Sequence, residues 1–376
     1  MTRDPAVAPH RRDRAPAHRR LYPFDMPRRA LLVIACFCLL AVGASAAPAA
    51  RSIPRSAPGA RPVPVPSAGG PVDTSHPTRV VGRGTAASCT SAAVVAAVRA
   101  GGIIRFSCGP NPVTIRMSAT AKVHNTSAQV VLDGGGLVTL SGEGRRRILY
   151  MDTCDPAQTW TTSHCQDQAT PQLVIQNMTF TAANSTGQRF DGGGGGAIFD
   201  RGGRLRIVNS DFIGNRCERD GPDIGGAAVR ALSQYHDLPV SVSNSRFTDN
   251  ACSNGAALSS IGVSWTVLDC RFVGNDAIGD GANPARSGTP GGGSGGAIYN
   301  DGDRMTLTIS GSVFEGNHAN EGGGAIFFVS DDRTGTMTIT HSTLQRNPND
   351  GFHTPGLAGI YFLGARRPTI TDSVVR

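Results

Sequence analysis

Apolar and polar residues alternate in a series of short stretches in the second half of the chain. Alternation with a period of two is the pattern of a β-strand that buries one face. The stretches are LVIQNMTFTAAN (from Leu173), LRIVNSDFIGN (Leu205), VSVSNSRFTDN (Val240), WTVLDCRFVGN (Trp265), LTISGSVFEGN (Leu307), MTITHSTLQRN (Met337) and PTITDSVV (from Pro368). The pattern therefore predicts an all-β region built from repeats of one short strand unit.

Two short phrases mark the repeat, Phe-x-x-Asn at the end of most stretches and Gly-Gly-Ala-Ile or a close variant before the next one. The Phe residues at 212, 247, 272 and 314 lie 35, 25 and 42 residues apart, and the surplus falls in segments rich in Gly, Pro and Asp. One unit is too small to bury its own apolar face, so units must stack as in a solenoid. Loops that vary in length between strands of constant register favour a right-handed parallel β-helix.

Stacking makes equivalent residues of successive turns neighbours, about 4.8 Å apart. The Phe residues are therefore expected to stack on one another. The asparagines are expected to form a ladder in which each side-chain amide bonds to the next. The ladder residues are Asn215, Asn250, Asn275, Asn317 and Asn347.

Composition agrees with a repeat architecture, because 48 Gly but only 14 Phe, 2 Trp and 5 Tyr do not suit a conventional layered core. The net charge of +8 has its origin in residues 1–61, which hold eleven Arg and three Asp. The remaining 25 basic and 25 acidic residues cancel. No nucleic-acid partner is therefore predicted for the folded part.

The N-terminal region reads as a secretory signal peptide over residues 1–46. Arg28 and Arg29 precede an apolar run from Ala30 to Val42, and an A-x-A arrangement follows at 44–46. Either Met1 or Met26 can be the true start. Residues 47–78, rich in Pro, Ala and Arg, are expected to form an extended linker, and 79–376 the β-helix, with a cap at 86–108 and repeats from about 113. We expect a secreted or extracellular protein with no membrane span after the signal peptide is removed.

The paired phrases GGAI and Phe-x-x-Asn resemble the repeats of the polymorphic outer membrane protein family, a branch of the pectin-lyase-like β-helix proteins. The resemblance covers roughly residues 173–376. Upstream, CTSAAVVAAVRAGGIIRFSC and VVLDGGGLVTLSG resemble the entry turns of secreted bacterial β-helices, where an amphipathic helix, here Ala92 to Val98, caps the stack. Such proteins leave a strand edge at the end of the stack, so an oligomer formed through the C-terminal edge is an open expectation.

Export permits disulfides among the seven cysteines that follow the signal peptide. Cys217 and Cys252 each lie two residues after a ladder asparagine, so adjacent turns bring them within bonding range. Cys154 with Cys165, and Cys89 with Cys108, are the other expected pairs. Cys270 takes the position that Ser210, Ser245 and Ser312 hold in other repeats, which predicts a buried, inert thiol.

Two functional hypotheses remain open. In the first, a rigid β-helix presents a groove or loops to a polysaccharide or a cell-surface partner. In the second, it is a polysaccharide lyase or hydrolase of pectate-lyase-like type that acts on an acidic glycan. Fold alone decides neither. The candidate catalytic residues are Asp200, Asp223, Arg230 and His236, and the enzyme hypothesis requires them to converge.

Acidic residues near the Gly-Gly-Ala corners could hold calcium or act as acid and base, but acids also favour exposed turns. A calcium requirement belongs only to the lyase hypothesis. No cofactor is identified, and the cysteine and histidine spacing predicts no metal site. The binding or structural role is the favoured hypothesis.

Overall fold

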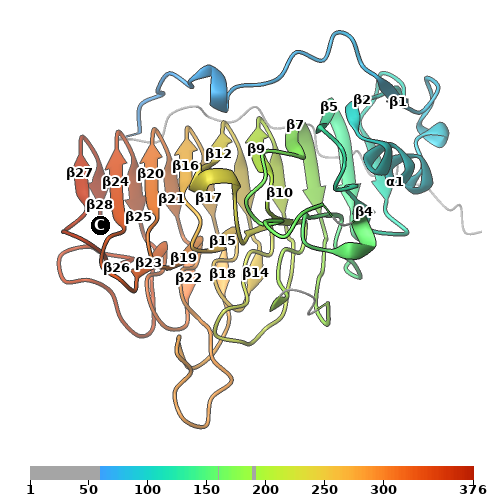
Figure 1. Ribbon diagram of the computed structural model, residues 1–376. Coiled ribbons are helices and arrows are strands. Elements are labelled where there is room, and N and C mark those ends of the chain that lie inside the picture. Colours follow the sequence, from blue (N-terminus) through green and yellow to red (C-terminus); the bar gives the residue numbers. More distant parts are fainter. Residues whose placement is uncertain (1–59, 160, 189–191) are drawn as a thin grey trace, which may run out of the picture. The chain divides into compact units, whose positions relative to one another are not determined.

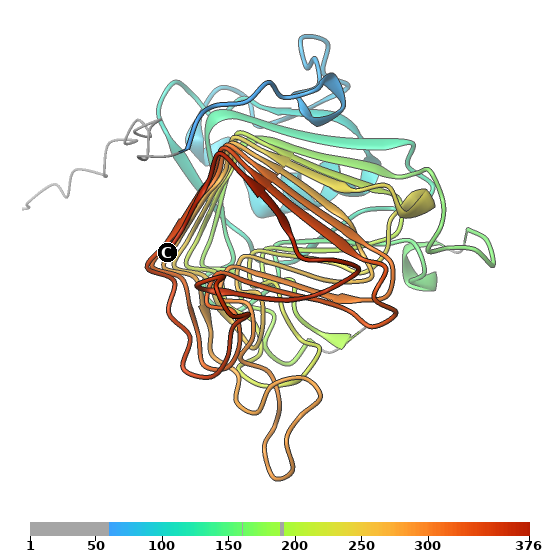
Figure 2. The same cartoon turned by 90° about the vertical axis from the view of Figure 1, so that its left-hand side faces the viewer.

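A computed structural model describes residues 60–159, 161–188 and 192–376. The predicted signal peptide and the first part of the predicted linker lie outside the described residues. The fold is all-β, and every pairing between its named strands is parallel (Figure 1). Viewed along the axis, successive turns of the chain superimpose (Figure 2). The parallel β-helix predicted from the repeat is confirmed.

Each turn of the helix contributes strands to a 17-stranded sheet that contains two columns, to an 8-stranded sheet and, in three turns, to a 3-stranded sheet. The first column holds β1 (Arg79–Val81), β2 (Gly102–Phe106), β9 (Arg204–Val208), β12 (Val240–Ser243), β16 (Trp265–Leu268), β20 (Thr306–Ser310), β24 (Thr336–Thr340) and β27 (Thr369–Thr371). The second column holds β3 (Val113–Arg116), β10 (Asp211–Ile213), β13 (Arg246–Thr248), β17 (Arg271–Val273), β21 (Val313–Glu315), β25 (Thr343–Gln345) and β28 (Val374–Val375). Two long strands run through both columns, β5 (Gln129–Ser141) and β7 (Gln172–Thr181).

The chain then turns into the smaller sheets. The eight-stranded sheet consists of β4 (Ala121–Lys122), β6 (Leu149–Asp152), β8 (Ile198–Arg201), β11 (Val229–Ala231), β15 (Leu258–Ile261), β19 (Ile298–Gly302), β23 (Ile326–Ser330) and β26 (Ile360–Leu363). The three-stranded sheet consists of β14 (Ala251–Cys252), β18 (Asp276–Ala277) and β22 (His318–Ala319).

One α-helix, α1 (Ser91–Ala100), occurs in the described part of the chain, at the N-terminal end of the stack. The Thr90 side chain accepts a hydrogen bond from the Ala93 N–H and begins the helix, and Gly101, with φ of 70°, ends it. Val94 and Val98 are buried in the core. The remaining helical segments are the 3₁₀ turns η1 (Ser67–Gly69), η2 (Ala86–Ser88), η3 (Pro156–Gln158) and η5 (Tyr235–Asp237).

The repeated Phe residues form one continuous stack inside the helix. Strand register places Phe180, Phe212, Phe247, Phe272 and Phe314 opposite one another, with Leu344 next in the column. Successive ring centroids lie 5.1, 4.9, 4.8 and 4.4 Å apart. The ring-to-ring distance follows the strand spacing, so the core is built turn by turn along the axis.

The repeated Asn residues line the corner that follows the second column. Each side-chain Nδ2 donates to the Oδ1 of the next, from Asn215 to Asn250 (2.9 Å), Asn275, Asn317 and Asn347 (2.8 Å each). Each Nδ2 also donates to a Phe carbonyl of the preceding turn, for example from Asn275 to Phe247 (2.9 Å). These side chains are buried, so they satisfy backbone groups that water does not reach.

A second polar column, of serine hydroxyls, lies between the two strand columns, and its hydrogen bonds were not predicted from the sequence. Backbone N–H groups donate to the hydroxyl of the next turn, as from Ser210 to Ser245 (3.1 Å), Cys270 to Ser312 (3.1 Å), Ser312 to Ser342 (3.1 Å) and Ser342 to Ser373 (3.0 Å). Cys270 occupies one place in this column and is buried. Burial raises the pKa of its thiol to about 12, which fits an unreactive side chain.

Residues 61–74 run along the ridge where the two strand columns meet (Figure 1). The hydrogen bonds that fix them to different turns are Arg61 N to His341 O (3.1 Å), Val63 N to Asp269 Oδ1 (3.0 Å), Ser243 Oγ to Gly69 O (2.8 Å), Val72 N to Gln176 Oε1 (2.9 Å) and Thr74 Oγ1 to Asp133 Oδ2 (2.5 Å). The predicted linker thus includes a segment that is bound to the stack.

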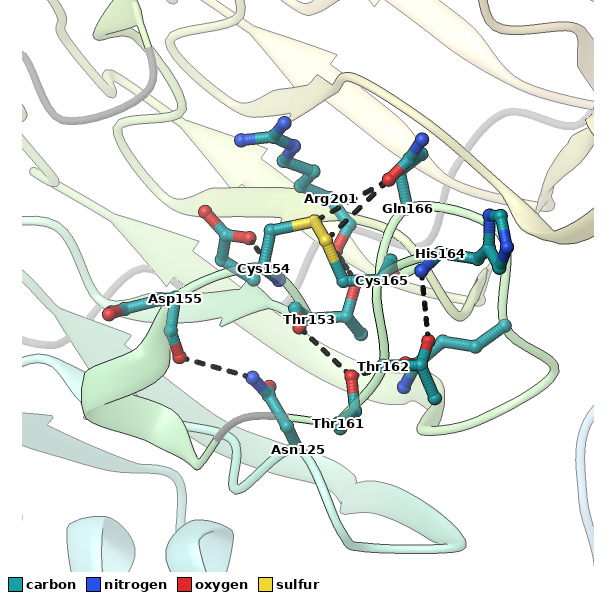
Figure 3. The surroundings of a disulfide bond; sticks show 12 residues. Asn125, Thr153, Cys154, Asp155, Thr161, Thr162, His164, Cys165, Gln166 and Arg201 are labelled. Atoms are coloured by element: carbon teal, nitrogen blue, oxygen red, sulfur yellow. Dashed lines mark hydrogen bonds between the residues drawn. A yellow bond between two sulfur atoms is a disulfide. The ribbon is translucent and has the colours of Figure 1, made fainter.

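Three disulfides join Cys89 to Cys108, Cys154 to Cys165 and Cys217 to Cys252. The second closes a loop beside the eight-stranded sheet (Figure 3). Next to it, the Thr161 hydroxyl donates to the Thr153 carbonyl, and the Asn125 amide donates to the Asp155 carbonyl (3.3 Å). These contacts attach the loop to the turn below it.

Candidate functional site

The eight-stranded sheet has two buried faces. Its inward face carries Ile198, Val229, Leu258, Ile298 and Ile326, which are in register and belong to the main core. The next residue of each strand points outward, which places Phe199, Arg230, Ser259, Tyr299 and Phe327 in a second column. This outward column is also buried. Loops that leave the second strand column cover it, so the sheet carries a polar and aromatic layer beneath a loop surface.

Asp200 and Arg230, two of the four candidate catalytic residues, lie on opposite faces of this sheet. Asp200 pairs with Ala231 and Met151 in the inward set, and it is fully buried. Its Oδ2 accepts a hydrogen bond from Gln234 Nε2 at 2.6 Å. Arg230 points outward with Phe199. The two side chains therefore cannot act on one substrate atom.

His236 and Asp223 lie beyond opposite ends of β11. His236 is in η5, after the strand, where its ring stacks on that of Tyr235 with centroids 3.8 Å apart. Its backbone N–H donates to Asp167 Oδ1 (2.6 Å). Asp223 lies in the loop before the strand. The structure thus brings Asp223 to the face that carries Arg230 and leaves Asp200 and His236 elsewhere.

Four polar side chains meet over the outward face, and we call them the Tyr299 cluster: Asp223, Asn283, Tyr299 and Asp301. Asn283 Nδ2 donates to Asp223 Oδ1 (2.8 Å), to Asp301 Oδ2 (2.7 Å) and to the Tyr299 hydroxyl. The Tyr299 hydroxyl donates to Asp301 Oδ2 (2.8 Å). Burial raises the pKa of Asp301 and that of Tyr299. The sequence patterns single out neither Asn283 nor Tyr299, and they place Asp301 only among the acidic residues near the Gly-Gly-Ala corners.

Arg230 lies beside this cluster and is only 2% exposed. Its Nε and Nη1 have no hydrogen-bond partner, and neither has the hydroxyl of Ser259, its neighbour in the column. Burial lowers the pKa of Arg230 to about 10, although Tyr299, Asp223 and Glu218 oppose the shift. The guanidinium remains charged at neutral pH, balanced by carboxylates that do not touch it.

These arrangements suit anchoring better than catalysis. Asn283 belongs to a hairpin whose strands meet at Asp280–Gly291 and Ala282–Gly292, and the Tyr299 cluster holds this hairpin to the sheet. A general acid or base must reach the substrate, but Asp200 and Arg230 are enclosed. In the part of the chain that the structure describes, no group of three or more His, Cys, Asp or Glu is arranged to hold a metal ion.

Replacing Asp200 with Asn is expected to remove a pH-dependent loss of stability. Burial raises the pKa of Asp200 well above 3.8, and Asp152 adds to the shift, while the Gln234 hydrogen bond and Arg204 oppose it. The folded state therefore holds this proton to a higher pH than the unfolded chain, in which Asp ionises above about pH 3.9. The free energy of unfolding of the natural protein should fall as the pH rises above that value. Asn300, three strands further along the inward column, shows that the column accepts an amide.

Urea midpoints measured from about pH 4 to pH 7 check this prediction. The free energy of unfolding of the D200N variant should depend less on pH. At pH 7 it should exceed that of the natural protein by roughly 1–3 kcal/mol. The control is D211N, since Asp211 pairs with Arg246 (2.6 Å) at a half-buried surface site and should instead lose some stability. Equal pH slopes for D200N and the natural protein would contradict the assignment.

Comparison with known proteins gives one finding. The model of the Chlamydia polymorphic membrane protein (Chlamydia_PMP) repeat matches residues 311–329. That segment contains one Phe-x-x-Asn phrase, at Phe314 to Asn317, and one Gly-Gly-Ala-Ile phrase. No curated protein and no solved structure matches the chain. The match supports a β-helix of the polymorphic-membrane-protein repeat type. In addition, no helix among the described residues is long and apolar enough to cross a membrane.

Proposed function

We propose that this protein is an exported, surface-located β-helix scaffold that binds a polysaccharide or a protein partner through its loops. The observation that carries the proposal is the hairpin of residues 280–292, which projects from the loop side of the stack (Figure 2). Its tip, from Pro284 to Gly288, is exposed. A rigid projecting loop loses little conformational entropy on binding, so it suits recognition.

Glu321 holds the hairpin through two contacts, one from Arg286 in the tip and one from Gly281 at the base. The Arg286 guanidinium donates to both carboxylate oxygens of Glu321 at 2.6 and 2.5 Å, and Glu321 is buried. The Gly281 N–H also donates to Glu321 Oε1 (3.0 Å). Asn283 adds contacts to Asp223, in an earlier turn, and to Asp301 of β19, so the hairpin is attached to segments on both sides of it in the stack. The hairpin is thus held in one conformation before any partner arrives.

The alternative function is a polysaccharide lyase or hydrolase of pectate-lyase-like type. It rests on the fold class, which hosts such enzymes, and on the candidate residues. Only Asp223 and Arg230 share a face, and Arg230 lies beneath the loops. The binding role therefore has the stronger support. A calcium requirement would belong to the alternative only.

The test uses residues 47–376 with pectic, alginate and glycosaminoglycan polymers and with cell-wall fractions. Retention on one of these, with no unsaturated uronide and no new reducing ends, is the expected result. The A285E/S287E variant should weaken retention about tenfold, because it places two charges on the hairpin tip. The matched control, T369E/T371E, places two charges on the exposed strand β27 and should bind as the natural protein does.

Two outcomes would overturn the proposal. Product formation from one polymer would establish the enzyme, and loss of product with a chelator would then direct attention to its acidic residues. Equal retention of both double variants would show that the hairpin tip is not the contact surface.

A further inference from the structure

Charge is segregated along the stack, although the folded part as a whole is nearly neutral. Residues 79–150 contain nine basic and two acidic residues, which gives +7 with His neutral. Residues 151–376 contain sixteen basic and twenty-two acidic residues, which gives −6. The near-zero net charge of the folded part therefore conceals a basic first segment, 79–150, and an acidic second segment, 151–376.

The basic residues are concentrated in space as well as in sequence. Residues 79–150 form α1 and the first strands of each face, at one end of the stack (Figure 1). A few strand spacings of about 4.8 Å cover this region along the axis of the stack, so its charges are gathered at one end of the stack. The exposed members are Arg79, Arg83, Arg99, Arg105, Arg116, Lys122 and Arg145. We call this set the basic cap.

The two acids of this region do not neutralise the cap. Asp133 is buried, and its carboxylate accepts hydrogen bonds from Thr74 Oγ1 (2.5 Å) and Asn177 Nδ2 (2.9 Å). Glu143 lies 3.8 Å from Arg116, whose side chain is 80% exposed. An exposed pair at that distance contributes little. The cap thus presents an uncompensated positive surface.

In later turns, two strand arginines form close ion pairs. Arg246 donates to both oxygens of Asp211 (2.7 and 2.6 Å), and Arg271 donates to Glu315 (3.0 Å). Among the described residues, no carboxylate lies at ion-pair distance from four of the cap residues: Arg83, Arg99, Arg105 and Arg145. The Arg79 guanidinium donates to the Gly101 and Ala100 carbonyls (2.7 and 3.1 Å) but also has no carboxylate partner. Unpaired guanidinium groups are suited to bidentate binding of carboxylate, sulfate or phosphate.

We propose that the basic cap binds an acidic polysaccharide. The two aromatic residues of this region, Phe106 and Tyr150, are not exposed, so no aromatic side chain is available to stack nucleobases. A polymer of uronate or sulfated sugars needs only the charge array, and it belongs to the surface environment of the proposed function. This inference gives a ligand class to the proposed function. It rests on that function only in taking the protein to be located at the cell surface.

Binding is measured on the full exported chain at about 50 mM NaCl, with polygalacturonate and dextran sulfate as probes and neutral dextran as the blank. The cap variant R83E/R105E/R145E should weaken binding of the charged polymers at least tenfold. The matched control R304E/R333E/R366E changes the net charge by the same amount at exposed sites in later turns. It should stay within about twofold of the natural protein. Equal thermal midpoints verify that both variants fold.

Three outcomes would overturn the inference: equal weakening by both triple variants, binding of neutral dextran as tight as that of the charged polymers, or tighter binding of duplex DNA than of polygalacturonate at equal charge concentration. The proposed function fails separately. If the hairpin variant loses binding and the cap variant does not, the loop-binding role stands and the basic cap is not its ligand site. Failure of the natural protein to bind any polymer or wall fraction would overturn both the proposed function and the basic-cap inference.

Discussion

Replacing Asn275 with Leu is expected to lower the free energy of unfolding by about 3–5 kcal/mol. Asn275 is in the middle of the asparagine ladder and is fully buried. Its Oδ1 accepts from Asn250 Nδ2, and its Nδ2 donates to Asn317 Oδ1 and to the Phe247 carbonyl. The Asn250 N–H also donates to this Oδ1 (3.3 Å), and leucine makes none of these bonds, so four neighbouring groups each lose a hydrogen bond. Asn250 Nδ2 keeps its bond to the Phe212 carbonyl and Asn317 Oδ1 keeps its bond from the backbone N–H of residue 275. Each buried group left unsatisfied costs about 1–3 kcal/mol, and the losses are not fully additive.

Urea denaturation followed by circular dichroism measures the effect. The matched control is N320L, because Asn320 lies three residues after a ladder position, is only half-buried and donates one hydrogen bond, to Gly279 O (3.0 Å). It should cost no more than about 1 kcal/mol. Equal losses of unfolding free energy for the two variants would contradict the prediction. They would mean that a ladder asparagine stabilises the stack no more than one hydrogen bond at a half-buried site does.

The parallel stack could be predicted because the repeat records it directly. In the two columns of the large sheet, strands such as Leu307-Thr-Ile309 alternate between core and surface, so period-two alternation identifies the inward residues. Phe-x-x-Asn then fixes the register of one turn on the next, since the repeated Phe rings stack on one another and the repeated Asn side chains bond to one another. A sequence pattern that is read along the stack predicts contacts between residues 25 to 42 positions apart.

The placement of the candidate site residues could not be predicted in the same way. In the eight-stranded sheet, Ile198-Phe199 and Ile298-Tyr299 are buried on both faces, because loops cover the outer one. Alternation therefore disappears, and nothing in the sequence says that Asp200 points inward while Arg230 points outward. The Tyr299 cluster was missed for a related reason. Asn283 reaches it from a hairpin within a Gly-rich insertion, whose conformation the repeat does not determine.

The net charge of the whole chain conceals how charge is distributed along the stack. The folded part sums to nearly zero, which argued against a nucleic-acid partner. The first turns nevertheless carry +7 and the later turns −6. A solenoid converts position in sequence into position along an axis, so a running charge count is informative here in a way that it is not for a globular domain. The basic cap follows from applying that count to the folded chain.

Replacing Phe272 with Ala is the second substitution with a large expected effect, a loss of about 3–5 kcal/mol. The Phe272 ring is fully buried between those of Phe247 and Phe314, with centroid distances of 4.8 and 4.4 Å. The two strands that flank β17 are β13 and β21, and backbone pairing fixes both of them to β17, so they cannot move to close the space. The cavity should remain open, and the stack should lose both ring contacts.

The control is F272L. The same column already contains Leu140 next to Phe180 and Leu344 next to Phe314, so the structure tolerates a leucine beside an aromatic ring. Leucine should therefore recover most of the loss, to within about 1.5 kcal/mol of the natural protein. Because each turn touches only its neighbours, F272A should act on local unfolding first, and hydrogen exchange should rise in β13, β17 and β21 before it rises in α1 and β2. Uniform acceleration of exchange along the stack would show instead that the β-helix unfolds as one cooperative unit, and in that case the Phe column would stabilise the whole molecule rather than its own turns.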